Sequence, residues 1–335
     1  MLLTAFTAVL FLLIAAAEPL AARLRLPFSV MLAAVGILIG SGALFLLRTN
    51  VTETLNPVAV GILSLPIRSS VFMYVFLPTL IFQATLEMNI RRMMDDWVPI
   101  LTLAVVAVVA ATLTIGFALH WIGGLPLMVG LLIGAIVSTT DPSAVVSIFR
   151  SLSAPKRLSR IVEGESLLND AAAIALFGLF LTYVMLGVPN PQLGEALGQF
   201  PGLIVGGVLA GWLVARIALA LMSLFGRFET AQISVSVAVP YLAYIGAEQL
   251  LGASGVIAVV VSGLTLNLMG PGRLAPAFWV NLKEVWGLLA HWAGALIFIL
   301  AALLIPRLLG EVRLNDLFLV GVVVIAAFVA RALIL

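Results

Sequence analysis

The sequence predicts an all-α polytopic membrane protein, on three observations. Hydrophobic residues make up 63% of the 335 residues, and charged residues only 10%. The mean hydropathy is +1.24. The apolar runs recur at a length of about 20 residues, which is the length that an α-helix needs to cross the hydrocarbon of a bilayer. A soluble protein needs a charged shell that so few charges cannot form, so that class is excluded.

Eleven spans are expected from these apolar runs. Residues 1–22 contain no basic residue ahead of the first run, so that run is interpreted as a span and not as a signal peptide. The expected spans are approximately residues 2–22, 27–47, 70–87, 98–121, 125–149, 161–187, 200–225, 230–249, 253–269, 281–305 and 315–335.

Lys and Arg are distributed unevenly between the loops, and this bias predicts the orientation. The odd-numbered loops and their edges hold eleven: Arg23, Arg25, Arg91, Arg92, Arg150, Lys156, Arg157, Arg160, Arg227, Arg273 and Lys283. The even-numbered loops hold four: Arg48, Arg68, Arg307 and Arg313. We therefore expect the odd loops in the cytoplasm and the N-terminus outside, in a bacterial inner (plasma) membrane. Lipid is the expected partner, and no nucleic acid is expected, because the basic residues belong mostly to loops.

Cysteine is absent, which excludes disulfides, cysteine-ligated zinc and thiol nucleophiles. No soluble domain fits between the spans. The segment 188–199 contains prolines and glycines and forms the natural seam between two halves of the chain.

Acidic residues concentrate between Ser138 and Asp170, inside or beside two of the most apolar regions. They are Asp141, Glu163, Glu165 and Asp170. An Asp in hydrocarbon costs roughly 2.5 to 3.5 kcal/mol on insertion scales, unless it faces a cavity or a partner. This stretch is therefore the expected working centre.

Span five carries Thr139, Thr140, Asp141 and Pro142 in its second half. A proline inside a helix removes a backbone donor and frees carbonyl groups, to which a cation could bind. Threonine hydroxyls and one carboxylate beside such carbonyls would suit a hard cation. A proline kink in which Asp141 caps the following half-helix is the alternative, and the two interpretations are compatible.

Span six carries two polar faces. Glu163, Ser166 and Asp170 follow the spacing i, i+3, i+7 and share one face, while Glu165 and Asn169 at i, i+4 share another. Two polar faces on one membrane helix need two different neighbours. One face can line a cation pathway while the other is held by structural contacts.

Arg331 in span eleven is the expected partner of Glu165, because an unpaired Arg and an unpaired Glu would each be costly in the membrane. Glu163 lies nearest to the basic loop before span six, where it is either a pathway residue or an interfacial acid. Asp170 is then the candidate for the transported ion. A carboxylate there would take up either a proton or a cation, and this competition suffices for exchange if the site faces each side in turn.

The chain resembles the monovalent cation:proton antiporter-1 family, the NhaP-type and sodium/proton exchanger group, in three motifs. They are Thr140-Asp141-Pro142, Glu163-Gly164-Glu165-Ser166-Leu167-Leu168-Asn169-Asp170, and Ala247-Glu248 through Ser254-Gly255-Val256-Ile257-Ala258 to Gly263. The resemblance implies an NhaA/NhaP-like inverted repeat of 13 helices, some of them discontinuous, with a dimerisation domain and a six-helix transport core. The halves would be a first repeat over 1–187 with core helices in 98–187, the linker 188–199, and an incomplete second repeat over 200–335.

The resemblance also implies a function. It is secondary-active antiport of a monovalent cation, with Na⁺ in first place and Li⁺ or K⁺ as alternatives, against H⁺. In the family the Asp of the Asn-Asp pair binds the ion or proton, which corresponds to Asp170. Thr140, Asp141 and Ser166 would also bind the cation, so that Asp170 and Asp141 are the acids that hold the transported metal ion. The resemblance implies no cofactor. It implies that the protein forms a homodimer.

Two further residue roles come from the resemblance. Asn169 before Asp170, in place of a second Asp, is similar to the electroneutral one-for-one exchangers. The Glu five residues before the binding Asp pairs with a late Arg in the family, which corresponds to a structural ion pair between Glu165 and Arg331.

The sequence departs from the family pattern at two places. Ile81-Phe82-Gln83 replaces a Leu-Phe-Glu context late in span three, so Gln83 is a pathway candidate that coordinates through its amide oxygen or holds a water. The chain also stops at Leu335, inside span eleven, where the family has two more helices. We therefore expect a truncated chain that does not exchange ions when it is expressed alone, because the broken helix that crosses span five is missing.

Three alternatives stay open at this point: a K⁺/H⁺ exchanger, a passive cation channel and, remotely, an intramembrane aspartyl protease. Proton-driven countertransport would separate an antiporter from a channel. A protease could use Asp141 and Asp170 on neighbouring helices, but the Tyr-Asp and Gly-x-Gly-Asp settings that such enzymes need are absent. An enzyme is therefore not expected.

Overall fold

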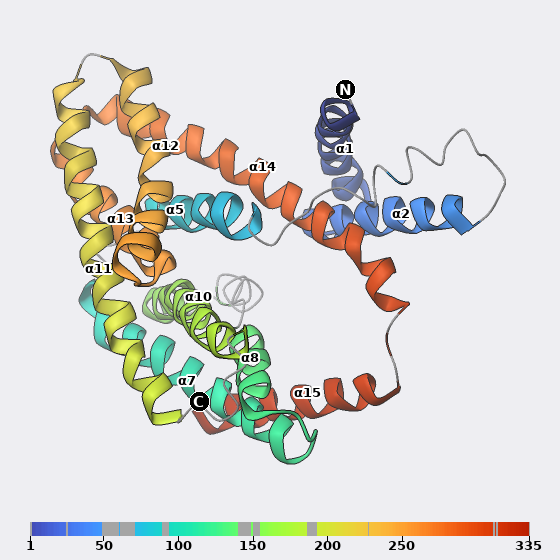
Figure 1. The fold of residues 1–335 in the computed structure, drawn as a ribbon. Coiled ribbons are helices and arrows are strands. Elements are labelled where there is room, and N and C mark those ends of the chain that lie inside the picture. Colours follow the sequence, from blue (N-terminus) through green and yellow to red (C-terminus); the bar gives the residue numbers. More distant parts are fainter. Residues whose placement is uncertain are drawn as a thin grey trace. The chain divides into compact units, whose positions relative to one another are not determined.

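The computed structural model describes residues 2–24, 26–48, 60, 71–88, 94–139, 149, 155–185, 193–226, 228–310, 312 and 314–334. Within these residues all regular secondary structure is helical (Figure 1). The elements are α1 (Leu2–Leu24), α2 (Phe28–Arg48), η2 (Phe72–Phe76), α5 (Leu77–Glu87), η3 (Met94–Asp96), α7 (Trp97–Trp121), α8 (Leu127–Val137), α10 (Lys156–Met185), α11 (Leu193–Leu224), α12 (Glu229–Ile245), η4 (Gly246–Leu250), α13 (Gly255–Met269), η5 (Gly270–Gly272), α14 (Pro276–Leu309) and α15 (Leu314–Ile334).

The expected spans each coincide with a helix of the described chain. Nine helices there are long and apolar enough to cross a membrane, and two shorter apolar helices, Phe72–Glu87 and Leu127–Val137, match the other two expected spans. The prediction of an all-α polytopic membrane protein is thus confirmed. Four boundaries differ by five residues or more: α8 ends at Val137, α10 begins at Lys156, α14 begins at Pro276, and α11 begins at Leu193 and not near residue 200. The eight residues before Pro201 contain Leu, Glu, Ala and Gln, which favour helix, and no proline.

Contacts between residues divide the chain into two compact units, which are described separately. The first comprises Met1–Leu80 and Val285–Arg313, and the second comprises Ile81–Glu284 and Leu314–Leu335. These contacts do not test a repeat boundary at 188–199, so the inverted repeat stays a prediction.

Helix α10, which carries the acidic motif, lies at the centre of the second unit. It packs against α7, α8, α11 and α13 (Figure 1). Its middle is closely surrounded, because six apolar residues there are buried: Ala172, Ala173, Ala175, Leu176, Leu179 and Phe180. The chain therefore places its polar motif next to a closely packed helical segment of this unit.

Glycines spaced four residues apart bring α8 close to α7. A Cβ atom added to Gly130 would lie 2.6 Å from the carbonyl oxygen of Gly116, and one added to Gly134 would lie 2.5 Å from that of Thr112. In membranes, small residues at this spacing let two helix backbones approach closely. The end of α8 is thereby held against α7 and beside α10.

Glycines spaced four residues apart also bring α11 close to α13. An added Cβ on Gly207 would lie 2.7 Å from the carbonyl oxygen of Ser254, and one on Gly211 would collide with the backbone of Ala258. Ser254 also caps α13, because its Oγ accepts a hydrogen bond from the backbone N–H of Ile257 at 3.3 Å. A turn with Gly252 at a φ of 57° precedes this cap.

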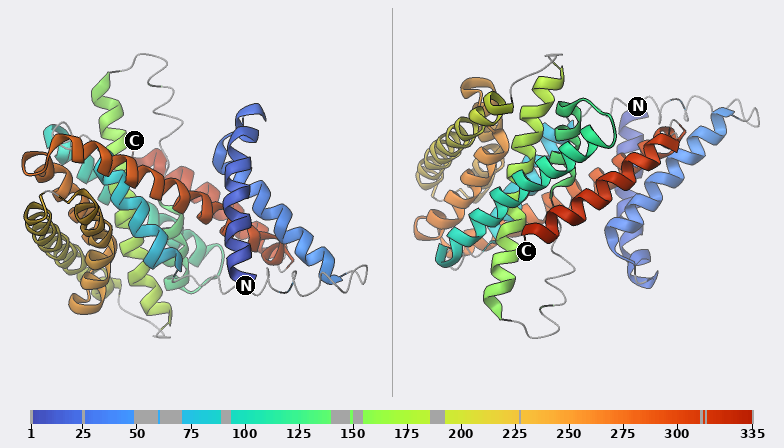
Figure 2. Two further views of the ribbon diagram at one scale, coloured as in Figure 1. Left: turned by 90° about the horizontal axis from the view of Figure 1, so that it is seen from above. Right: turned by 90° about the horizontal axis from the view of Figure 1, so that it is seen from below.

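Helix α15 packs along α7 in the second unit (Figure 2). Ile115 and Leu119 of α7 form a buried apolar cluster with Val322 and Ala326 of α15. This packing fixes the height of α15 along α7, and with it the position of the arginine in the last turn of α15.

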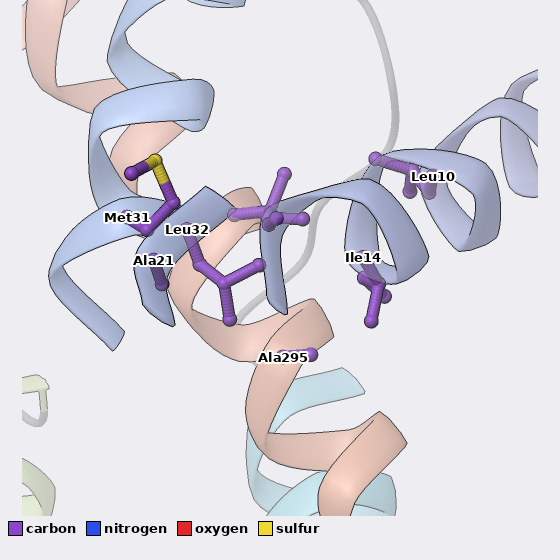
Figure 3. Packing of buried hydrophobic residues seen from close by; sticks show 8 residues of the cluster. Leu10, Ile14, Ala21, Met31, Leu32 and Ala295 are labelled. Atoms are coloured by element: carbon purple, nitrogen blue, oxygen red, sulfur yellow. The ribbon is translucent and has the colours of Figure 1, made fainter. Parts of the chain in front are cut away.

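The first unit has its own apolar core between α1, α2 and α14 (Figure 3). Its buried residues are Leu10, Ile14, Ala17, Ala21, Met31, Leu32, Ala295 and Ile299. A glycine also brings two helices close together here, since a Cβ added to Gly36 of α2 would lie 2.5 Å from the carbonyl oxygen of Ile299 in α14. Ring contacts add to this packing: Phe11 meets Trp292 edge to face at 5.5 Å, and Phe28 stacks on His291 at 5.3 Å.

The crossing of α11 and α13 gives a prediction about stability. Gly211→Ala should lower the melting temperature in detergent, because overpacking a close contact costs roughly 1–3 kcal/mol. Gly202→Ala is the matched control in the same helix, where an added Cβ meets no atom within 4 Å. Alanine should there leave stability unchanged or raise it, because it favours helix over glycine. Thermal unfolding of both purified variants decides the matter, and equal melting temperatures would contradict the packing argument.

Candidate ion-binding site

Two faces of α10 meet two different environments. Glu165 and Asn169 continue into a buried stripe with Leu176 and Phe180, and Asn169 is only 1% exposed. Asp170 lies about 100° further around the helix than Asn169 and is exposed. The acid expected to bind the ion therefore lies on the accessible face, and its neighbour in sequence lies in the interior.

Asp170 lines a pocket between the end of α8 and the middle of α10. The pocket has a volume of about 240 Å³. Its walls are formed by Ala135, Ile136, Thr139, Asp170, Ala173, Ile174 and Phe177. Two of these residues are polar: Thr139 follows the end of α8, and Asp170 lies on α10. A hydroxyl and a carboxylate therefore share one small apolar pocket.

The end of α8 places Thr139 in this pocket. The helix ends at Val137, and the buried Ser138 donates a hydrogen bond from Oγ to the carbonyl oxygen of Ala135 at 2.9 Å. This bond satisfies one carbonyl of the last turn, so the Ser138 side chain is turned back onto α8. Thr139 then follows at the pocket wall, half-buried.

Asn169 carries a buried acceptor that is not used. Among the described residues its Oδ1 accepts no hydrogen bond. Leaving such a group unsatisfied costs roughly 1–3 kcal/mol, so a buried amide oxygen of this kind is a place where an ion or a water finds a ligand. Thr112 on the adjoining helix α7 has a buried hydroxyl that also forms no hydrogen bond among the described residues.

The structure brings Glu165 and Arg331 together. Nη2 of Arg331 donates to Oε1 of Glu165 at 3.0 Å. The Glu165 side chain is 13% exposed and that of Arg331 is 30% exposed. A charge-assisted hydrogen bond thus joins α10 to α15 in a poorly hydrated place. That this pair serves structure and not transport stays a prediction.

A second ion pair, which the sequence did not reveal, joins the beginnings of α7 and α10. Nε of Arg157 donates to Oδ1 of Asp96 at 2.7 Å. Asp96 is buried and directly precedes α7, where a negative charge is favoured by the helix dipole. In the sequence, the feature that could have indicated this ion pair is an acidic residue immediately before an apolar run.

Asn267 of α13, also unanticipated, holds the end of α5. Its Nδ2 lies 2.8 Å from the carbonyl oxygen of Thr85 and 2.8 Å from that of Met88, with a third contact to Leu86 at 3.1 Å. Carbonyl groups at a helix end lack partners inside the helix, so this amide supplies one in a region that offers little water. An Asn inside the apolar run of span nine was the signal for such a contact.

The remaining sequence-predicted residues are placed only in part. Thr140 and Asp141 lie outside the described residues, and so does the side chain of Glu163 on α10. Ser166 is half-buried on α10. Gln83 is half-buried on α5 and is not among the residues that line the Asp170 pocket. In the part of the chain that the structure describes, no group of three or more His, Asp or Glu could hold a metal ion.

A bundle of apolar helices whose central helix presents a carboxylate in a pocket is typical of an integral membrane protein with a functional site between its helices. Residues 8–335 match the family described as sodium/hydrogen exchanger, transmembrane. The chain belongs to this family, which confirms the resemblance seen in its motifs.

Similar proteins agree with this assignment. The low-affinity Na(+)/H(+) antiporter NhaS1 of Synechocystis is 35% identical over 263 residues, which are 78% of this chain and 49% of the relative. The Na(+)/H(+) antiporter NhaG of Bacillus atrophaeus is 32% identical over 294 residues, 86% of this chain and 54% of the relative. The chain thus spans about half the length of these curated relatives.

A solved structure shares the fold. The sodium proton antiporter MjNhaP1 from Methanocaldococcus jannaschii superimposes with a TM-score of 0.72 at 21% identity, covering 100% of this chain and 78% of that chain. The expected NhaP-like fold is therefore confirmed.

The Glu165–Arg331 contact gives a prediction about stability. Glu165→Gln should lower the free energy of unfolding by roughly 1–3 kcal/mol, because it leaves the guanidinium without its charged partner. Glu87→Gln, at an exposed acid near the end of α5, should cost much less. Adding Arg331→Gln to Glu165→Gln should cost less than Arg331→Gln alone. Melting temperatures of the four variants in one detergent provide the measurement, and strictly additive losses would argue against a coupled pair.

Proposed function

We propose that the chain acts in a secondary-active, electroneutral Na⁺/H⁺ antiporter, in which Na⁺ and H⁺ compete for Asp170 under alternating access. The observation that carries the proposal is the position of Asp170. It is exposed in a small pocket with Thr139, while the neighbouring face of the same helix is buried and tied to α15. A carboxylate so placed can exchange its proton for a cation without disturbing the packing of α10.

The remaining site residues have separate roles in this proposal. Asp170 and Asp141 supply the negative charge, and hydroxyl and amide oxygens complete the coordination, as hard cations require. The proposed ligands are Asp170, Asp141, Thr140, Ser166 and Asn169, with Gln83 and Glu163 along the pathway and Glu165 with Arg331 as structural support.

Relatives support Na⁺ as the cation, since both NhaS1 and NhaG are named Na(+)/H(+) antiporters. A K⁺/H⁺ exchanger is the alternative that a cation series resolves. In the same proposal the protein is not an enzyme, needs no cofactor and forms a homodimer in a bacterial inner membrane, with its N-terminus outside. Its two halves are the inverted repeats 1–187 and 200–335, joined by 188–199.

Removing the charge of Asp170 tests the proposal directly. Asp170→Asn in the full-length protein should abolish Na⁺-dependent proton movement, because an amide can neither take up a proton nor balance the charge of a cation. The assay is the collapse of an imposed pH gradient in proteoliposomes on addition of Na⁺, Li⁺ or K⁺. Asp95→Asn, at an exposed acid ahead of α7, is the matched control and should retain exchange. Exchange at the wild-type rate by a folded Asp170→Asn protein would refute the assignment.

The hydroxyl of Thr139 offers a finer test. Thr139→Val should raise the Na⁺ concentration for half-maximal exchange by about tenfold, because the cation loses one oxygen neighbour of the Asp170 pocket. Thr114→Val is the control, since the Thr114 hydroxyl donates to the Ala110 carbonyl oxygen within α7 and does not line that pocket. Unchanged Na⁺ dependence of Thr139→Val would remove this residue from the site.

A further inference from the structure

Arg216 is a cation inside a membrane span. It lies in α11, within the apolar segment Pro201–Leu224, and is half-buried. Its Nη1 is 3.9 Å from Sδ of Met269, and its Cζ is 5.7 Å from the ring centre of Trp212. Among the described residues it forms no ion pair with a carboxylate. A guanidinium at such a position is costly unless an anion or the membrane interface accommodates it.

A second cation, Lys283, lies near the contacts of Arg216. Met269 is the last residue of α13, so the Arg216 side chain reaches the level where that helix ends, as a long basic side chain does at a membrane interface. The next residue, Gly270, lies against the ring of Trp279, because a Cβ added there would be 2.6 Å from Cζ3. Nζ of Lys283 is 5.9 Å from the centre of the same ring. We call Trp212, Arg216, Met269, Trp279 and Lys283 the Arg216 cluster.

An apolar cavity lies along the same helix pair. It has a volume of about 570 Å³ and is lined by residues of α7, α10, α11 and α13. Its walls are Leu101, Thr102, Val105, Val106, Leu168, Ala172, Ile204, Val208, Ile257, Val260, Val261 and Leu264. Thr102 is the one polar residue in this wall. Because the surrounding solvent is lipid hydrocarbon, a chain of methylene groups is the natural occupant of such a space.

The cavity and the Arg216 cluster share the helices α11 and α13. Ile204 and Val208 of the cavity wall and Trp212 and Arg216 of the cluster recur every four residues, so they form one ridge of the helix. Arg216 is eight residues beyond Val208, which corresponds to about 12 Å along the axis. That separation is shorter than half the hydrocarbon thickness of a bilayer, about 15 Å. One lipid can therefore reach both places.

We propose that an anionic phospholipid binds here, with its phosphate at the guanidinium of Arg216 and one acyl chain in the cavity. A phosphate oxygen supplies the charge-assisted hydrogen bonds that Arg216 does not make to any carboxylate of the described chain. Lys283 adds attraction for an anionic headgroup, and Trp212 and Trp279 suit the polar boundary of the membrane. The apolar wall gives the acyl chain the contacts that hold it. This site is independent of the proposed antiport.

The first experiment asks which lipid binds. The full chain, purified in detergent and stripped of lipid, is examined by native mass spectrometry and by thermal unfolding with phosphatidylglycerol, phosphatidylcholine, or inorganic phosphate alone. Phosphatidylglycerol should bind saturably and raise the melting temperature, with about tenfold weaker binding of phosphatidylcholine. Equal binding of both lipids would overturn the role of the anionic headgroup. Equal stabilisation by inorganic phosphate would overturn the lipid and leave a simple anion site.

The second experiment separates headgroup from chain. Arg216→Gln should weaken phosphatidylglycerol binding about tenfold, and Arg307→Gln, which removes an exposed charge at the end of α14, should not. Val208→Phe should weaken the binding of both lipids, because it fills part of the cavity. Full binding by a folded Arg216→Gln or Val208→Phe protein would overturn the proposal. If either variant fails to fold, the wild-type comparison of the two lipids still decides it.

Discussion

The ion pair between Glu165 and Arg331 joins two helices of the second unit, α10 and α15, that lie far apart in the sequence. Helix α10 carries acids and amides through an apolar bundle, where each such group needs a partner. Arg331 meets that need for Glu165, and it can do so because Ile115 and Leu119 of α7 hold α15 at the matching height. Apolar packing thus places the cation of Arg331 opposite Glu165.

The two faces of α10 differ in burial and in their contacts. The face with Glu165, Asn169 and Leu176 cannot turn outward without breaking an ion pair and exposing packed side chains. The face with Asp170 is exposed and borders a pocket shared with the end of α8. Rigid support behind a reactive carboxylate is what a site needs if its occupant is to change between a proton and a cation.

Sequence reasoning was strong where the membrane constrains the chain and weak where contacts are specific. Span length and hydropathy predicted the apolar helices of the described chain, because backbone groups in hydrocarbon must be satisfied within the helix. Glu165 and Arg331 were matched by elimination, since few charges lie in the spans. By contrast, Arg157 with Asp96 and Asn267 with the end of α5 join residues 61 and about 180 positions apart. Nothing local in a sequence specifies such partners.

The glycine contact between α11 and α13 accounts both for the close packing of these helices and for the apolar cavity beside them. At Gly207 and Gly211 its backbone nearly touches α13, and helices that touch at one point must diverge along the rest of their length. Val208 and Ile257 lie beside this crossing and line the cavity that the divergence leaves towards α7 and α10. In a water-soluble protein a void of this size would be costly to keep. In a membrane, the lipid chain proposed above would offset this cost, so a glycine contact that fixes two helices can also maintain an apolar cavity beside them.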